Sequence, residues 1–222
     1  MFLEVIGALL PTAVGVALSP LPIIAMVLML GTTRGRSQGS AFAVGWTGGL
    51  VVVSVAIVWL SGVVVPADEV SPAVPWVQGL LGVLLLGLAL RQWRRRPGPD
   101  DPVRMPAWMG AVDTFGLGRT AAIGAALSGA NPKNLALTAA AAATIGQAGL
   151  GPGATVVAIA TFVILASVTV VVPLILYLAA RDRSARSLRV LRTFMSTHNA
   201  AIMVVVLLLL GAKLLGNGVA AL

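Results

Sequence analysis

The sequence predicts an all-α integral membrane protein with six transmembrane helices, arranged as two inverted repeats of three helices each. Three observations support this class. The 222 residues are 58% hydrophobic and 10% charged, with a mean hydropathy of +0.99, whereas soluble chains are roughly 45–50% apolar and about 25% charged. Apolar stretches close to the length of a membrane span, about 20 residues, recur along the chain. Finally, a proline motif interrupts the first apolar stretch of each half.

The predicted spans are, in order, residues 5–30, 42–65, 75–90, 120–150, 153–180 and 199–219. The third is short and needs neighbouring residues to complete it, and the fourth is long and interrupted. An arginine- and proline-rich cytoplasmic linker, residues 92–112, separates a first half (1–91) from a second half (113–222) within one membrane domain (1–222). Because each half has an odd number of spans, the second enters the membrane in the opposite orientation, as an inverted repeat requires.

The positions of the charges predict how the chain is oriented. Arginines cluster after the first, third and fifth predicted spans, whereas the alternate loops contain Asp68 and Glu69 or no charge. The positive-inside rule therefore places the arginine-rich loops in the cytoplasm and both termini outside the inner (plasma) membrane. The segment 184–198 has arginines on one side and apolar residues on the other, which predicts an interfacial helix on the inner leaflet. The net charge of +8 thus serves topology and does not indicate nucleic-acid binding.

The residue types present exclude several kinds of site. The chain has no cysteine, one histidine and seven acidic residues, so it offers no disulfide, no thiolate ligand and no cluster for a zinc or di-metal centre. It also lacks a Walker-type phosphate-binding motif. We therefore expect no cofactor and no metal, and a protein that is not an enzyme.

Two proline motifs interrupt predicted spans, Ser19-Pro20-Leu21-Pro22 in the first and Asn131-Pro132-Lys133-Asn134 in the fourth. Proline removes a backbone donor and clashes with the preceding turn, so a regular helix does not continue through these positions. Irregular backbone at membrane depth is tolerated where it lines a cavity or is buried in protein. Paired breaks in corresponding spans indicate a substrate site near the midplane. The alternative is a pair of structural kinks packed against neighbouring helices.

Lys133 favours the interpretation as a site. A cation in the bilayer interior costs roughly 3 kcal/mol on insertion scales, and no acidic residue lies one helical turn away. Its charge needs a carboxylate from elsewhere, exposed backbone carbonyls or a bound anion. Asp113 is the expected partner within the protein if the broken segment folds back. In the functional interpretation, Lys133 contacts a substrate anion beside Ser19 and Asn134. The alternative is a snorkelling or internally satisfied lysine.

Small residues predict where helices pack closely. Gly45 and Gly49 form a GxxxG pair in the second span, and Gly124 and Ser128 form a small-xxx-small pair in the fourth. We expect both pairs to be packing faces within one chain rather than dimer contacts.

The two proline motifs, with an aspartate–aromatic segment ahead of the second, resemble the GAP-like family of the LysE transporter superfamily. These are the actinobacterial peptidoglycolipid- or sulfolipid-addressing proteins. The resemblance covers essentially the whole chain and implies export, in this family the delivery of glycolipids to the cell envelope. The residues that it implies in substrate binding or translocation are Ser19, Pro20, Pro22, Asp113, Asn131, Pro132, Lys133 and Asn134.

The leading hypothesis is an inner-membrane exporter, or an accessory to translocation, for a cell-envelope lipid, working by alternating access around the paired broken helices. A second hypothesis changes the cargo to a small metabolite such as an amino acid. A remote third is an intramembrane serine protease that uses Ser128 and His198. The expected partners are membrane lipids and a lipid or small-molecule substrate, with a homodimer or a larger lipid-export complex left open and no nucleic acid.

Overall fold

The computed structural model describes residues 2–64, 73–94, 96 and 107–220. In this part of the chain the regular structure is entirely helical, which confirms the all-α part of the predicted class. The elements are α1 (Phe2–Ala17), α2 (Pro20–Leu30), α3 (Gly35–Val64), α4 (Ala73–Arg94), the 3-10 helix η1 (Ala107–Thr114), α5 (Leu117–Gly129), α6 (Pro132–Gln147), α7 (Pro152–Ala179), α8 (Arg181–Thr197) and α9 (Asn199–Ala220).

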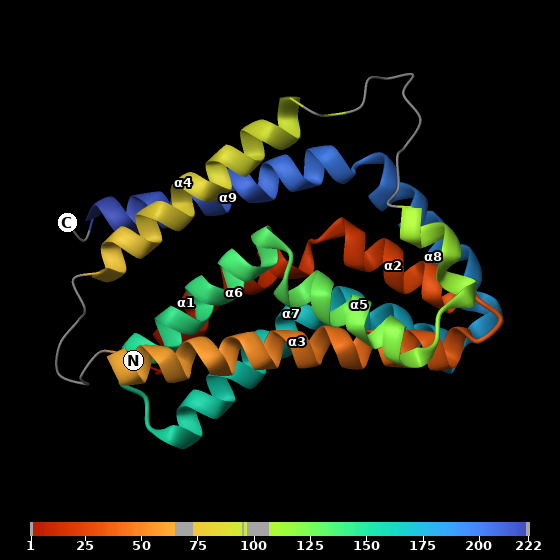
Figure 1. Ribbon diagram of the computed structural model, residues 1–222, viewed down its shortest axis with the longest axis horizontal. Helices are drawn as coiled ribbons and strands as arrows, with labels where there is room; N and C mark the ends of the chain where they lie inside the picture. The colour runs from red at the N-terminus through yellow and green to blue at the C-terminus, as the bar shows by residue number, and fades with distance from the viewer. Residues whose placement is uncertain (1, 65–72, 95, 97–106, 221–222) are drawn as a thin grey trace.

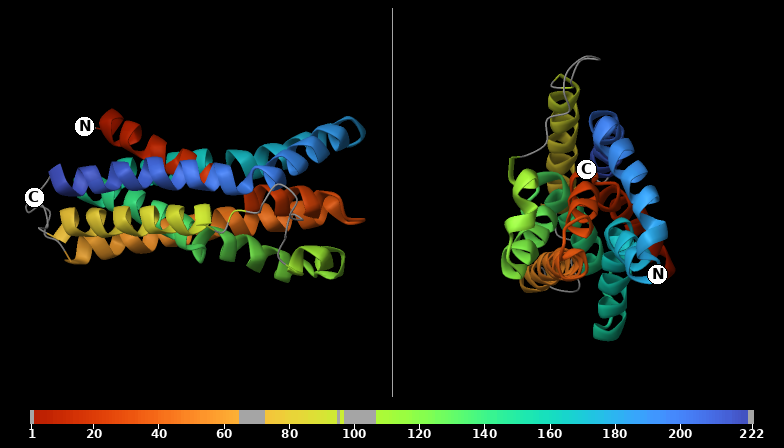
Figure 2. Two further views of the ribbon diagram at one scale, coloured as in Figure 1. Left: turned by 90° about the horizontal axis from the view of Figure 1, so that it is seen from above. Right: turned by 90° about the vertical axis from the view of Figure 1, so that its right-hand side faces the viewer.

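The long helices run broadly along one axis, and both chain ends lie at the same end of it (Figures 1 and 2). The opposite end holds the α2–α3 connection, η1, the start of α5 and helix α8 (Figure 1). These elements contain Arg34, Arg36, Arg119, Arg189 and Arg192. The molecule thus separates its termini from a basic end, as the predicted topology requires.

Several helices are long and apolar enough to cross a membrane. They are α3 over Gly35–Leu60, α7 and α9, and the bent pair of α1 and α2 makes a fourth candidate if it counts as one span. The structure therefore supports a membrane protein with 3 to 4 candidate spans. Helix α4 and the pair of α5 and α6 do not belong to this set, so the six-span arrangement stays a prediction.

Several element boundaries differ from the sequence-based expectation. Helix α4 has 22 residues instead of the short 75–90, because it begins two residues earlier, at Ala73, and continues through Arg91 to Arg94. Helix α3 begins seven residues earlier than predicted, at Gly35, and α8 begins at Arg181 rather than at 184. The predicted linker 92–112 is partly helical at both ends, in α4 and η1. Its middle, like Asp68 and Glu69, lies outside the described residues.

The predicted breaks in the first helix of each half are confirmed. Helix α1 ends at Ala17, and α2 begins at Pro20 after a bend of 55°. Helix α5 ends at Gly129, and α6 begins at Pro132 with Asn131 as its N-cap. In both cases proline occupies the first helical turn, where its missing N–H costs nothing and its fixed φ suits the helix.

Helices α3 and α5 approach each other through the small residues that the sequence predicted. A Cβ added at Gly45 would overlap the carbonyl of Ala121, and one added at Gly124 would overlap the carbonyl of Phe42. Gly49 likewise faces the hydroxyl of Ser128. The prediction that these faces pack within one chain is confirmed.

This packing predicts opposite effects for two substitutions in the same helix. Gly45→Ala places a methyl group against the Ala121 backbone, which cannot give way as a side chain can, so it should destabilise the protein by about 1–3 kcal/mol. Gly48→Ala is the matched control, because nothing lies within 4 Å of its added Cβ; its higher helix propensity should leave stability unchanged or slightly raised. Thermal unfolding in neutral detergent measures both, and equal transitions for the two variants would contradict the packing.

Candidate functional site

The two broken helices meet near the middle of the long axis (Figure 1). Three polar side chains are buried where they meet: Ser19 with 2% of its surface exposed, Lys133 with 2% and Asn134 with 0%. All three were predicted as site residues. Their burial in an otherwise apolar bundle requires that each polar atom finds a partner.

The first break leaves the carbonyl of Gly15 without its usual donor. In a helix, Val16 O would accept from the N–H of residue 20, but Pro20 has none. The N–H of Ser19 donates to Val16 O instead, at 3.2 Å. Ser19 is the residue whose N–H would otherwise reach Gly15 O. The Nζ of Lys133 fills that position and donates to Gly15 O at 2.7 Å.

Helix α7 provides the hydrogen-bond donor for a second carbonyl at the same break. Thr169 Oγ1 donates to Ala17 O at 2.6 Å. Ala17 is the last residue of α1, and the chain bends by 55° before α2, so the end of α1 leaves its carbonyl without an intrahelical donor. Thr169 is thus part of the site. Sequence analysis missed it, because a threonine in an apolar span gives no sign of which carbonyl it will face.

The second break is organised by its two asparagines. Asn131 caps α6, its Oδ1 accepting from the backbone N–H of Lys133 at 3.1 Å. Asn134 Nδ2 donates to Leu127 O near the end of α5 at 2.9 Å, and Asn134 Oδ1 accepts from Ser19 Oγ at 2.7 Å. Asn134 therefore joins the two breaks, which are 115 residues apart in the chain.

The three predicted prolines act through the backbone. Pro20 and Pro22 are buried in the first turn of α2, and Pro132 is exposed at the start of α6. They set the breaks and the freed carbonyls, and they offer no side-chain donor or acceptor to a ligand.

The predicted pairing of Asp113 with Lys133 is wrong. Asp113 lies on η1, is exposed, and lines a cavity with residues of α2 and α8 at the basic end. Helix α5 begins at Leu117 and covers 13 residues before it reaches the break, a distance of about 20 Å at 1.5 Å per residue. The carboxylate is therefore separated from Lys133 by the length of α5.

Among the described residues, Lys133 has no counter-ion. Within the part of the chain that the structure describes, its ammonium has a backbone carbonyl as partner and no carboxylate. A carbonyl is a dipole, which compensates a buried cation less well than an anion does. The start of α6 adds further positive potential from its helix dipole. The meeting point of the breaks is therefore suited to an anion.

A second buried network holds the start of α5 against α3. Gln38 Nε2 donates to Phe115 O at 2.8 Å, and Thr120 Oγ1 donates to Gln38 Oε1 at 2.5 Å. Gln38 is 1% exposed. Sequence analysis missed this network as well, because it depends on the register between two helices.

Ser128 and His198 do not form the pair that a serine protease needs. Ser128 Oγ donates to Ala125 O of its own helix at 3.0 Å. His198 is exposed, stacks on Phe194 at 4.5 Å between ring centroids, and its Nδ1 lies 3.0 Å from Phe194 O. Neither contact brings the serine and the histidine together.

Residues 9–220 match the family model described as "Sap, sulfolipid-1-addressing protein". The match covers α2 to α9 completely and the second half of α1. Both breaks and every residue of the site fall inside it. Neither a curated protein nor a solved structure matches the chain.

The contact between the breaks predicts a measurable coupling. Asn134→Ala removes one buried and one partly buried hydrogen bond and should lower stability by about 1–3 kcal/mol. Ser19→Ala removes one of them and should cost less, and the double variant should cost less than the sum of the two. Thermal unfolding of the single and double variants in detergent gives the four stabilities of this double-mutant cycle. Thr161→Ala is the control, because its hydroxyl bonds its own helix. Strict additivity of Ser19→Ala and Asn134→Ala would show that the two side chains do not interact.

Proposed function

The chain belongs to the sulfolipid-1-addressing protein family, and we propose that it exports a cell-envelope lipid across the inner (plasma) membrane, alone or as an accessory to a larger export complex. The observation on which this proposal depends is the buried Lys133, held by the carbonyl of Gly15 where the two broken helices meet. An anionic headgroup is the partner that this ammonium lacks. A glycolipid that bears such a group is the proposed cargo.

The proposed architecture is a six-span inverted repeat, with both termini outside the cell. The longer helices of the two halves match in order and length, although α8, between α7 and α9, has no counterpart in the described part of the first half. Each has a broken helix, then a long helix of 30 or 28 residues, then a helix of 22 residues. The packing is also reciprocal, since α3 packs on α5 and α6, α7 packs on α1 and α2, and the two 22-residue helices, α4 and α9, pack on each other. This correspondence supports the proposal, which includes membership of the wider LysE superfamily.

Alternating access follows from the contacts at the breaks. The bonds from Lys133 to Gly15 and from Ser19 to Asn134 join the first half to the second. An anionic group that reaches Lys133 replaces a charge–dipole contact with a charge–charge contact, which is stronger in a low dielectric. Binding therefore releases Gly15 and lets the halves separate. Return of Lys133 to Gly15 after release of the cargo resets the carrier.

A small metabolite such as an amino acid, whose carboxylate would pair with Lys133, is the second candidate cargo. The near-complete burial of Ser19, Lys133 and Asn134 favours it, because a small anion needs less room than a glycolipid. The reciprocal contacts and the mechanism would be the same. Dimerisation and an obligatory export partner stay predictions.

The orientation is testable by thiol labelling, because the chain contains no cysteine. Thr33 and Gln147 are exposed at the α2–α3 and α6–α7 connections. Thr33→Cys should react with a membrane-impermeant maleimide only after the cells are permeabilised, and Gln147→Cys should react in intact cells. Ser54→Cys, at a position 1% exposed in α3, should stay unlabelled in both conditions. Labelling of Thr33→Cys and Gln147→Cys from one side of the membrane would contradict the six-span topology.

Export is testable at Lys133. Lys133→Ala removes the cation, so transfer of the lipid to the outer surface in a complemented deletion strain should fall by at least about tenfold, while the protein still inserts and accumulates. Lys213→Ala is the matched control, since Lys213 is the other lysine of the chain and is exposed on α9. Surface lipid is measured by extraction of intact cells and mass spectrometry. Normal surface lipid in the Lys133→Ala strain would refute this site.

A further inference from the structure

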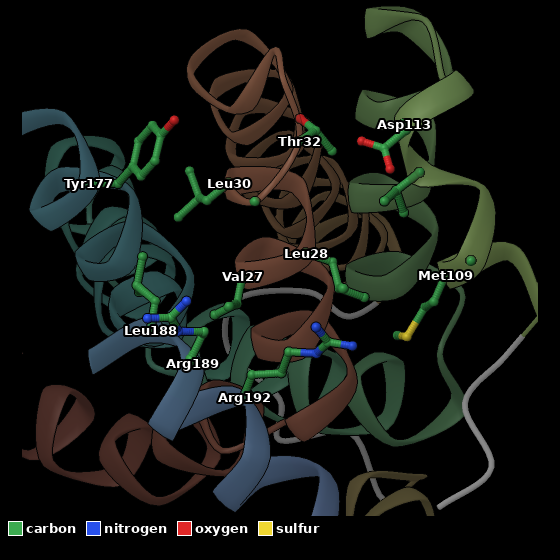
Figure 3. A pocket seen from close by; sticks show the side chains of 13 residues that line it. Val27, Leu28, Leu30, Thr32, Met109, Asp113, Tyr177, Leu188, Arg189 and Arg192 are labelled. Atoms are coloured by element: carbon green, nitrogen blue, oxygen red, sulfur yellow. The ribbon is translucent and has the colours of Figure 1, made fainter. Parts of the chain in front are cut away.

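A second polar site lies at the basic end of the molecule, separate from the breaks. A cavity of about 420 Å³ opens between α2, η1, α7 and α8 (Figure 3). Its volume lies in the range of small-molecule binding sites. It adjoins the C-terminal part of α2, whereas the break lies at the N-terminus of this helix, whose 11 residues span about 16 Å. A ligand in this cavity would therefore not touch Lys133.

One wall of the cavity is cationic. Arg189 and Arg192 are three residues apart on α8 and line the cavity together, as residues at this spacing share one helix face. Figure 3 shows the guanidinium group of Arg192 directed toward Leu28 of α2. Neither arginine has an ion-pair partner among the described residues. Two unpaired guanidinium groups at the edge of one cavity form a site for an anion with several oxygen atoms, because each presents a fork of N–H donors.

The rest of the lining is mainly apolar. Val27, Leu28 and Leu30 of α2 and Leu188 of α8 lie beside the arginines (Figure 3). A free inorganic anion gains no binding energy from such an apolar surface. An acyl chain does, at about 25 cal/mol per Å² of apolar area removed from water. The combination of two cationic groups with an aliphatic floor fits an amphiphile.

We propose that this cavity binds the headgroup of an anionic lipid that bears a phosphate or sulfate ester, with Arg189 and Arg192 on the ester oxygens and the first part of an acyl chain along α2. Its role as the entry site for cargo at the cytoplasmic end rests on the proposed function; the binding itself does not. Asp113 lines the same cavity from η1 (Figure 3). Its carboxylate repels the ester and so limits how tightly the lipid is held.

Binding to the purified full chain in neutral detergent tests the proposal. The probes are dioctanoyl phosphatidylglycerol, dioctanoylglycerol, which keeps the chains without the phosphate, and inorganic phosphate, which keeps the anion without the chains. The phosphatidylglycerol should bind more tightly than either of the others. In the variant Arg189→Gln/Arg192→Gln, its Kd should rise roughly 10–100-fold, as expected for the loss of two charge-assisted contacts.

A matched pair of arginines provides the control. Arg91 and Arg94 are also three residues apart near a helix end and exposed, and they lie outside the cavity. Arg91→Gln/Arg94→Gln removes the same charge and should leave the Kd unchanged. An equal loss of affinity in both variants would show that the effect depends only on net charge, and it would overturn the site. Inorganic phosphate that binds as tightly as the lipid would overturn the lipid assignment.

A variant that is expected to bind the lipid more tightly keeps the test independent of folding defects, because a folding defect would weaken binding. Asp113→Asn removes the repelling carboxylate and should tighten phosphatidylglycerol binding severalfold, whereas an unchanged or weaker affinity contradicts the arrangement. Lys133→Ala should bind the probe like the unmodified chain even though it fails to export. Loss of binding in the Arg189→Gln/Arg192→Gln variant and loss of export in the Lys133→Ala variant are thus separate results, and either proposal can fail while the other stands.

Discussion

The missing N–H groups of the prolines are the constraint on which the rest of the site depends. The break that they cause at the end of α1 leaves carbonyls of this helix without amide donors, in a bundle where a bilayer offers no water to replace them and each unsatisfied group costs several kcal/mol. Lys133 of α6 satisfies Gly15, and Thr169 of α7 satisfies Ala17. The break therefore determines which helices must lie beside it. It also explains how a lysine can be buried in this bundle without a carboxylate.

In the proposed mechanism, the same constraint links structure to transport. A carbonyl freed by proline holds the ammonium of Lys133 well enough to bury it, but less strongly than an anion would. The resting contact is therefore one that a charged cargo can replace. Because Gly15 and Lys133 belong to different halves, this exchange acts on the contact between the halves. If a carboxylate paired with Lys133, the charge of the lysine would already be compensated. An anionic cargo would then gain much less interaction energy from binding to it.

Local rules predicted the parts of this structure that depend on a few neighbouring residues. They include the helical class, the breaks at Pro20 and Pro132, and the close packing of Gly45 against α5. The partner of Lys133 could not be predicted in this way, because Gly15 is 118 residues away and its carbonyl becomes free only through the Ser19–Val16 bond. Asp113 was the expected partner because it is the nearest carboxylate before the motif in the sequence. The lengths of the intervening helices, and not the sequence separation, decide which groups meet.

The chain has two lysines, Lys133 and Lys213, so selective isotope labelling of lysine gives two side-chain amine signals, which a Lys213→Arg variant assigns. The most direct test of the account is to titrate a sulfated glycolipid into the labelled protein in detergent micelles and follow both signals by NMR. We predict that the Lys133 signal shifts and saturates as its ammonium exchanges the Gly15 carbonyl for the sulfate, while the exposed Lys213 does not change. A Lys133 signal that stays unmoved at saturating lipid, or moves only in parallel with Lys213, would contradict the claim that the paired breaks bind the cargo.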